Sequence, residues 1–362
     1  MLKLLSIFAC LIITNCICAQ RFGGTPPSVK WKQINTDTAR IIFAPGLDSQ
    51  AQRVASLVHL QAQQRTAALG DRLKKINIVL QNETVIGNGY VGLGPYRSEF
   101  YLTPAVNNFD QGSIGWADAL AIHEYRHVEQ FNNFRNGISK LAKTLFGEEG
   151  YALAINASIP DWFYEGDAVY SETVLSRQGR GRLPLFMNAY PSVWNAGKNY
   201  SWMKMRNGSW KDYVPGHYHL GYMFVNYGYE KYGLDFWEKV TRDASAFKGL
   251  FYPFQKAIKR HAKVDYQTFK KDAFDYYKKG KSAMQPNHSA DSGYNQIFDV
   301  NKKYVTNYVF PYQLPGDSLL YLKTTYRHRP GFYIKSGSRQ RKLRIKDISI
   351  DDQFSYRDGK IV

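Results

Sequence analysis

Two histidines and a glutamate stand together in a spacing that suits metal chemistry. In His123-Glu124-Tyr125-Arg126-His127 the histidines are four residues apart. On a helix both imidazoles then lie on one face, about one turn apart, and can reach one cation. Glu124 projects beside them and can take a proton from water on that cation. The pattern predicts a metal site with its own general base.

A catalytic zinc site needs one more protein ligand and leaves its fourth position to water. Gln130 and Asn133 occupy the positions where a metzincin has glycine and histidine, so that class is excluded. The third ligand must therefore lie farther along the chain. The candidates are Glu148, Glu149, Asp161, Glu165, Glu172, His217 and His219.

A second predicted helix carries two of these carboxylates. Pro160 and Asp161 make a favourable helix start. Glu165 and Glu172 are seven residues apart, which is two helical turns, so they share one face. One carboxylate can bind the metal while the other holds a ligand histidine in place. Gly166 lets another backbone approach this helix closely.

These two segments together resemble a known family. His-Glu-x-x-His followed by Trp-Phe-x-Glu-Gly-x-Ala-x-Tyr-x-Glu is similar to the gluzincin zinc peptidases of the peptidase-MA-like clan. The resemblance implies that Glu124 is the general base that activates water and that Glu172 supports a ligand from behind. It further implies one zinc ion, held by His123, His127 and Glu165.

A later segment agrees with the same family. Tyr218-His219-Leu220-Gly221 resembles its Tyr-x-x-Gly stretch, whose tyrosine donates to the oxyanion of the tetrahedral intermediate. A phenol suits this task because it is neutral at pH 7 and its hydrogen bond can strengthen as charge develops. The resemblance therefore implies Tyr218 as a second catalytic residue, with His217 and His219 as alternative donors.

The resemblance covers roughly residues 90–235 and has departures. The spacing from His127 to Glu165 is longer than in the family's aminopeptidases. The Gly-x-Met-Glu-Asn segment, which binds the substrate's free amine in those enzymes, does not precede the metal helix. Nothing then favours an aminopeptidase, and endopeptidase specificity stays open. A strand around 99–103 could pair with an extended substrate, as zincin edge strands do.

Hydrophobic periodicity indicates the elements that must position these residues. Before residue 110 we predict strands at 39–43, 76–80 and 99–103, a helix at 51–69, and a turn or bulge region at the glycines of 87–94. From 114 to about 285 we predict helices at 116–134, 161–177, 216–231 and 265–279. Farther on, β-rich runs at 304–310, 318–325, 331–334 and 342–350 alternate with turns, and 354–362 resembles a strand–turn–strand.

These patterns predict an α+β fold. We expect a zincin-like metallopeptidase domain, with a small N-terminal mixed sheet at 20–110 and a helical zinc-binding part at 111–285. A short all-β segment at 295–362 follows, and it resembles the opening blade of a propeller cut off part-way.

Residues 1–19 have the pattern of a secretory signal peptide. Lys3 precedes an apolar run from Leu4 to Ile13 that is too short to span a bilayer, and Ile17-Cys18-Ala19 is an acceptable cleavage site. The alternatives are an uncleaved anchor and a lipoprotein acylated at Cys16. All 3 cysteines lie in this segment, which excludes disulfides, thiolate zinc and iron–sulfur sites from the predicted mature chain.

The chain is strongly basic, with 48 Lys and Arg against 30 Asp and Glu, a net charge of +18. After residue 240 there are 24 basic and 11 acidic residues, so this third carries +13. Because the predicted signal sends the chain to the periplasm, cell envelope or exterior of a bacterial-type cell, we expect no nucleic-acid partner. Peripheral contact with an anionic membrane or a cell-wall polymer fits the charge better.

Three segments of the chain are rich in Lys and Arg. Lys256–Lys263 and Arg339–Lys346 are either solvated faces or sites of attachment to anionic lipid or wall polymer. Arg177–Arg182 is predicted to be a flexible basic loop that borders the cleft and could favour acidic substrates.

The sequence as a whole predicts an exported zinc-dependent metallopeptidase that hydrolyses peptides or proteins. Two alternatives stay open. One is a catalytically inactive, zincin-like envelope protein that binds partners through its β segment and basic surface, and the other is a zinc hydrolase of a non-peptide cell-wall amide.

Overall fold

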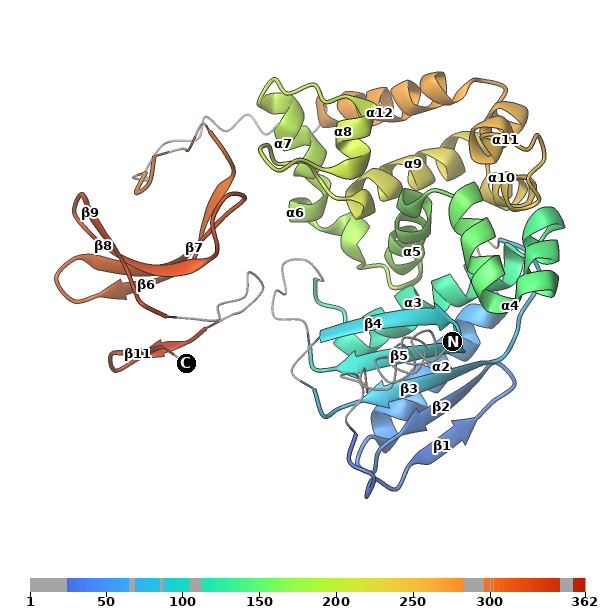
Figure 1. Ribbon diagram of the computed structural model, residues 1–362, viewed down its shortest axis with the longest axis horizontal. Coiled ribbons are helices and arrows are strands. Elements are labelled where there is room, and N and C mark those ends of the chain that lie inside the picture. Colours follow the sequence, from blue (N-terminus) through green and yellow to red (C-terminus); the bar gives the residue numbers. More distant parts are fainter. Residues whose placement is uncertain are drawn as a thin grey trace, which may run out of the picture.

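The computed structural model describes residues 25–64, 69–84, 87–104, 112–282, 296–299, 301, 303–345 and 354–361. The predicted signal peptide at 1–19, with Cys16, lies outside these residues, so export stays a prediction. Along the described chain, a mixed sheet with two helices is followed by a helical part and then by a small antiparallel β part (Figure 1). The molecule is thus a mixed α+β protein, as predicted.

The N-terminal part is a five-stranded sheet in the order β1-β2-β3-β5-β4. β2, β3 and β5 run parallel, while β1 and β4 pair antiparallel at the two edges. Alternate residues of β2 and β3, such as Ile41 and Ile78, are buried, which is the periodicity visible in the sequence. The strands are β1 Lys32–Asn35, β2 Ala39–Phe43, β3 Ile76–Gln81, β4 Gly87–Leu93 and β5 Tyr96–Leu102.

Strand β4, rather than the strand predicted at 99–103, forms the sheet edge beside the helical part. β5 has β3 on one side and β4 on the other, so the expectation that it pairs with a substrate is wrong. The turn region predicted at 87–94 is also mostly strand, and of its four glycines only Gly94 lies in a turn. A Cβ on Gly89 would come within 2.7 Å of the Leu120 side chain. Gly89 therefore serves close packing against a helix.

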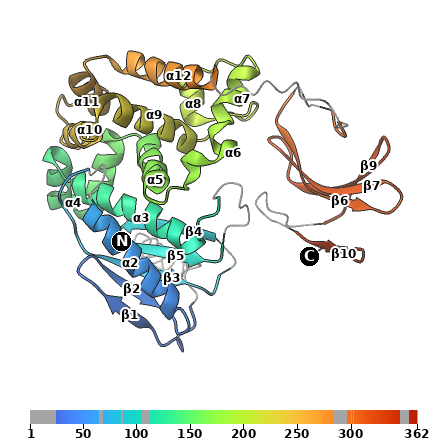
Figure 2. The same cartoon turned by 180° about the vertical axis from the view of Figure 1, so that it is seen from behind.

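Two helices cover one face of the sheet. They are α2 (Asp48–Gln64), which connects β2 to β3, and α3 (Trp116–Asn133). Both views show α3 between the sheet and the helical part (Figures 1 and 2). The apolar sides of both helices pack on the sheet in one core, which includes Val54, Val58, Leu120, Val128, Ile78 and Leu80.

The helical part is built around buried aromatic rings. Trp162 packs edge-to-face on Phe224 with ring centroids 5.3 Å apart, and Phe163 lies 5.0 Å from Trp237. The four helices predicted after residue 114 are all present, with ends shifted by three residues or fewer, whereas α4, α10, α11 and the short α6, α7 and α8 were not predicted. The bounds are α4 Gly137–Ser158, α5 Asp161–Leu175, η2 Arg180–Arg182, α6 Pro184–Met187, α7 Ala189–Asn195, α8 Trp202–Asn207, α9 His217–Tyr232, α10 Phe236–Ser245, α11 Pro253–Ala262 and α12 Tyr266–Ser282.

The C-terminal β part has its own small core, formed by Leu320, Leu322, Phe332 and Phe354. Its four-stranded antiparallel sheet has the order β6-β7-β8-β9, and β10 and β11 form the predicted strand–turn–strand. β9 ends at Lys342, so the strand predicted at 342–350 is absent from 343–345, while 346–350 lies outside the described residues. The strands are β6 Thr306–Leu314, β7 Ser318–Thr325, β8 Gly331–Ser336, β9 Arg339–Lys342, β10 Tyr356–Arg357 and β11 Lys360–Ile361.

The predicted propeller blade and the possibility of a membrane-spanning helix can both be compared with the structure. The described residues of the C-terminal β part form one four-stranded sheet and the β10–β11 pair and show no propeller, so the identity of this part as a propeller blade stays a prediction. Among the helices of the described residues, none combines the length and hydrophobicity needed to cross a bilayer.

Candidate metal centre

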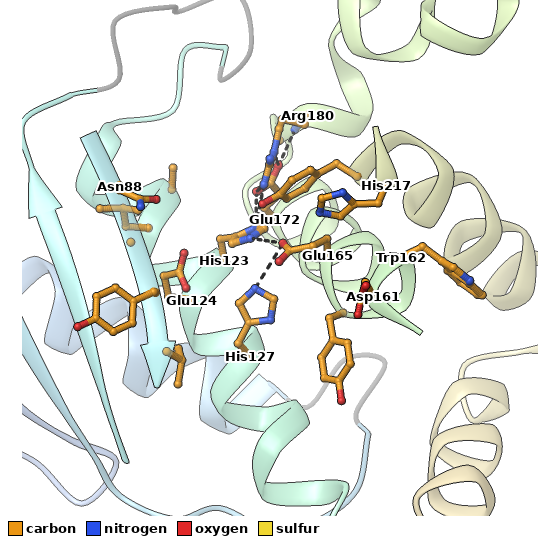
Figure 3. A pocket seen from close by; sticks show the side chains of 18 of the residues that line it. Asn88, His123, Glu124, His127, Asp161, Trp162, Glu165, Glu172, Arg180 and His217 are labelled. Atoms are coloured by element: carbon orange, nitrogen blue, oxygen red, sulfur yellow. Dashed lines mark hydrogen bonds and ion pairs between the residues drawn. The ribbon is translucent and has the colours of Figure 1, made fainter. Parts of the chain in front are cut away.

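Helices α3 and α5 bring three of the predicted ligands together (Figure 3). Nε2 of His123 lies 3.2 Å from Oε2 of Glu165, and Nε2 of His127 lies 3.6 Å from the same oxygen. One ligand atom from each residue lies within 4.8 Å of the other two. Two imidazoles and a carboxylate that converge in this way can hold a metal ion. The arrangement by itself does not identify the ion.

Two glycines at the crossing of α5 and α9 determine where Glu165 lies. A Cβ on Gly166 would be 2.1 Å from the carbonyl carbon of Gly221, and one on Gly221 would be 1.8 Å from the carbonyl oxygen of Trp162. A side chain fits at neither position, which confirms the close approach predicted at Gly166. Because Tyr218 precedes Gly221 by about one helical turn, the crossing places it in the same cleft as Glu165.

Glu172 contacts the His123 ring on the side away from Glu165, in the role predicted for it. Its Oε2 lies 3.1 Å from Nδ1 of His123. Nη2 of Arg180 lies 2.9 Å from the same nitrogen, so these two side chains together fix the orientation of the ring, with Nε2 facing the triad. Arg180 secures Glu172 in turn, because Nε donates to Oε1 at 2.7 Å and Nη2 to Oε2 at 3.0 Å.

Arg180 is the main correction to the sequence analysis. The segment predicted as a flexible basic loop contains the short helix η2 packed against α5, and the side chain of Arg180 points into the site (Figure 3). Its flanking glycines permit this packing: a Cβ on Gly179 would meet the Thr173 backbone at 2.4 Å, and one on Gly181 would meet the Tyr222 ring at 2.3 Å. The Gly-Arg-Gly pattern is therefore the signal in the sequence for this position of Arg180. Its glycines allow close packing here and do not make the segment a flexible loop.

His127 has a separate support that sequence analysis missed. Its Nδ1 lies 2.9 Å from the side-chain oxygen of Gln130, so it can donate there. The Gln130 amide donates to the Tyr164 carbonyl oxygen at 2.9 Å and to Asp167 Oδ2 at 2.8 Å. Asp167 is fixed by a 2.7 Å ion pair with Arg126. The signal was the spacing of three residues between His127 and Gln130, which share one face of α3.

The two predicted catalytic residues reach the cleft from different elements. Glu124 projects from α3 toward β4 (Figure 3), and a Cβ on Gly89 would lie 3.0 Å from its Oε1. Tyr218 comes from α9, with its ring centroid 6.4 Å from that of His123 and the Arg180 guanidinium 4.9 Å from its own centroid. Both line a cleft of about 690 Å³ that also contains the triad.

The remaining ligand candidates do not join the triad. His217 and Asp161 line the cleft, and His217 is exposed. His219 instead stacks on Phe186 with centroids 4.3 Å apart, so of the two alternative oxyanion donors only His217 faces the cleft. Two candidates lie outside the residues that line this cleft, Glu148 and Glu149.

The electrostatics of the site favour a bound cation. Burial lowers the pKa of His123, but the carboxylates of Glu165 and Glu172 raise it to about 9. Glu165 also raises the pKa of His127 against the same effect of burial. Burial raises the pKa of Glu165, yet hydrogen bonds with both histidines bring it well below its ordinary value. Burial and the charge of Glu165 raise the pKa of Tyr218, so its phenol is neutral at pH 7.

Comparison of the chain with protein-family models and with curated proteins finds no match. The interpretation of the site therefore rests on its residues and their geometry. These describe an α+β protein in which His123, His127 and Glu165 form a triad able to bind a metal ion.

Proposed function

We propose that this protein is an exported zinc-dependent metallopeptidase with a zincin-like fold. One observation carries the proposal: the triad of His123, His127 and Glu165 lies in a cleft that also contains the carboxylate of Glu124 and the phenol of Tyr218. Two imidazole nitrogens and one carboxylate oxygen are a ligand set of catalytic zinc sites, which keep one position open.

The donor set fits zinc in its composition and orientation. Glu172 and the side-chain oxygen of Gln130 each face the Nδ1 of one histidine, so both Nε2 atoms face Glu165, where a metal would displace their protons. The carboxylate of Glu165 is ionised because its pKa is strongly lowered. When bound, zinc would supply a Lewis acid and lower the pKa of a water molecule to about 7.

The chain's own residues provide the remaining chemistry. Glu124 can accept a proton from water and deliver it to the leaving nitrogen of the peptide. Tyr218 can donate a hydrogen bond to the carbonyl oxygen as negative charge develops there. Strand β4, at the sheet edge, lines the cleft at 88–91 and can pair with an extended peptide.

The test is a digest of casein and mixed peptides with and without a zinc chelator. We expect the chelator to abolish cleavage and added zinc to restore it. Glu124→Gln should keep one zinc ion per chain and lose about 10²–10⁴-fold in rate. Glu149→Gln, the same change at an exposed position outside the cleft lining, should leave both properties unchanged.

Cleavage that survives the chelator, or a Glu124→Gln protein as fast as the wild type, would contradict the proposal. A wild-type protein that binds zinc but cleaves no peptide would instead support the two alternatives, an inactive envelope protein or a hydrolase of cell-wall amides. Release of soluble fragments from cell-wall material would distinguish the hydrolase from the inactive protein.

A further inference from the structure

The apolar side of the first half of α4 faces solvent. Ile138, Leu141, Leu145 and Phe146 recur at helical spacing, yet they are 40%, 55%, 63% and 71% exposed. We call these four residues the α4 stripe. The residue that faces the protein is the fully buried Ser139, whose hydroxyl donates to the Ser245 carbonyl oxygen at 2.7 Å.

This orientation is the reverse of what an ordinary surface helix shows, where the apolar stripe packs on the core and the polar side meets water. Contiguous exposed apolar side chains on a folded protein mark a binding surface. The neighbouring loop continues the pattern, because Gly137 at the start of α4 adjoins Ala246 and the loop after Ala246 exposes further apolar residues. These are Leu250, Phe251 and Tyr252.

Basic side chains accompany the α4 stripe. Lys140 and Lys143 lie between its members in the sequence, and Arg135 precedes it. Arg72 donates to the Arg135 carbonyl oxygen, which brings the exposed segment 71–75 to the start of α4. Segments 71–75 and 135–149 together contain six basic residues against three acidic ones. The six are Arg72, Lys74, Lys75, Arg135, Lys140 and Lys143, of which Lys143 already pairs with Glu148 at 2.8 Å.

We propose that the first half of α4 attaches the protein to the surface of an anionic lipid bilayer. The α4 stripe would lie among the headgroups and upper acyl chains, with the basic side chains against lipid phosphates. The basic excess makes lipid a better occupant than an apolar protein surface. In both views α4 lies at the outer margin of the molecule (Figures 1 and 2).

This surface is distinct from the basic clusters noted in the sequence. Those clusters, at 256–263 and 339–346, offer charge, whereas the α4 stripe offers exposed apolar side chains together with charge. The attachment does not depend on the proposed peptidase activity.

The test is co-sedimentation of the purified protein, starting at residue 20, with vesicles of phosphatidylcholine alone or mixed with phosphatidylglycerol. We expect binding to the anionic vesicles that weakens with salt. Leu145→Glu/Phe146→Glu should lower the partition coefficient about a hundredfold, because two apolar side chains no longer enter the interface. Leu185→Glu/Met203→Glu also replaces two apolar residues by Glu, at similarly exposed positions on α6 and α8, and should bind like the wild type.

Circular dichroism confirms that each variant is folded. The proposal is overturned if the wild type does not bind the anionic vesicles, or if the α4 double variant binds them as the wild type does. It is also overturned if the wild type ignores vesicles but sediments as a dimer that the α4 variant dissociates, since the stripe would then be an interface between two copies.

Discussion

At the scale of single residues, Glu172 and Arg180 together orient His123, one of the three candidate metal ligands. Glu172 faces Nδ1 of His123, and Arg180 donates to both oxygens of that carboxylate. A guanidinium that binds both carboxylate oxygens fixes the plane of the group as well as its position. The orientation of His123 therefore depends on Arg180 in two ways, through Glu172 and through Nη2, which lies 2.9 Å from Nδ1 of the ring.

We predict that Arg180→Gln weakens zinc binding about 10- to 100-fold, the usual effect of removing a group that orients a metal ligand. Arg180→Lys should recover part of this loss, since one ammonium cannot reproduce the paired contacts. Competition with a chromogenic chelator measures the affinity. Arg177→Gln, an equal change at an exposed position three residues away, is the control and should bind zinc normally. Equal affinities in the two Gln variants would refute the role.

Tyr218 provides a second test at this scale. Tyr218→Phe should lower kcat by about 10²–10³-fold, because the hydrogen bond that strengthens with developing charge is lost. KM should change little, since that bond contributes mainly in the transition state. Steady-state kinetics with a peptide substrate measure both. Tyr252→Phe, at an exposed position outside the cleft lining, is the control, and unaltered kinetics in Tyr218→Phe would remove this residue from the mechanism.

At the scale of elements, the site is assembled where α5 crosses α9. Gly166 and Gly221 let the two backbones touch, and this contact brings Glu165 and Tyr218 into one cleft. The crossing therefore links the metal site to the proposed oxyanion donor.

We predict that Gly221→Ala lowers the free energy of unfolding by about 1–3 kcal/mol, as overpacking in a close-packed interior does. It should also weaken zinc binding, because α5 must move away with Glu165. Urea denaturation and chelator competition measure the two effects. Gly280→Ala on α12, where an added Cβ meets no atom within 4 Å, is the control and should retain full stability. A stable, zinc-binding Gly221→Ala protein would contradict this account of the crossing.

Helices α10 and α11 are joined by a buried carboxylate. Asp243 accepts hydrogen bonds from Arg260 at 2.5 Å and from His261 at 3.0 Å, and it pairs with Lys248 at 2.6 Å. Burial raises the pKa of Asp243, but these three partners lower it to about 2. Because its pKa in the unfolded chain is about 3.9, the carboxylate stabilises the fold above that pH, and this stabilisation is lost as the pH falls toward 2.

Asp243→Asn should therefore lower the free energy of unfolding by about 1–2 kcal/mol at pH 7, since the partly exposed basic partners regain water. The difference from wild type should shrink as the pH falls from about 4 to about 2. Urea denaturation over this pH range measures it. Asp235→Asn, which breaks an exposed i,i+4 pair with Lys239, should change stability by less than about 0.5 kcal/mol. A pH-independent difference for Asp243→Asn would be inconsistent with the lowered pKa.

Some elements of this protein can be predicted from its sequence and others cannot, for physical reasons. α3 and α5 could be predicted because their periodicity, the Pro160-Asp161 start and the ligand spacing agree locally. β4 could not, because a glycine that makes room for a helix side chain, as Gly89 does for Leu120, looks the same in sequence as one that forms a turn. The place of Arg180 was missed because it depends on contacts with Glu172 and Tyr218, the latter distant in the chain.

At the scale of the whole molecule, the C-terminal β part does not share the cores that position the site. Its buried residues form a separate cluster from those of the sheet and the helical part. We predict that a chain ending at residue 295 binds zinc normally and cleaves a small peptide with kcat/KM within about twofold of the full chain, as expected for separate units. Chelator competition and peptide kinetics measure this, and loss of zinc binding by a truncated protein that remains folded would show that the parts are coupled.

The remaining α+β part forms the site between its two halves. α3 packs on the sheet and supplies both histidines, while α5 belongs to the aromatic core and supplies the glutamate. A cation held by all three residues would join these halves. Zinc should therefore raise the midpoint of thermal unfolding, by an amount that grows with the logarithm of the free zinc concentration relative to Kd.

The most direct test of the central claim is anomalous X-ray scattering at the zinc absorption edge from crystals of the zinc-loaded protein. We predict one strong peak among Nε2 of His123, Nε2 of His127 and the carboxylate of Glu165. A zinc-loaded protein whose peak lies elsewhere, or a protein that takes up no zinc at all, would contradict the account.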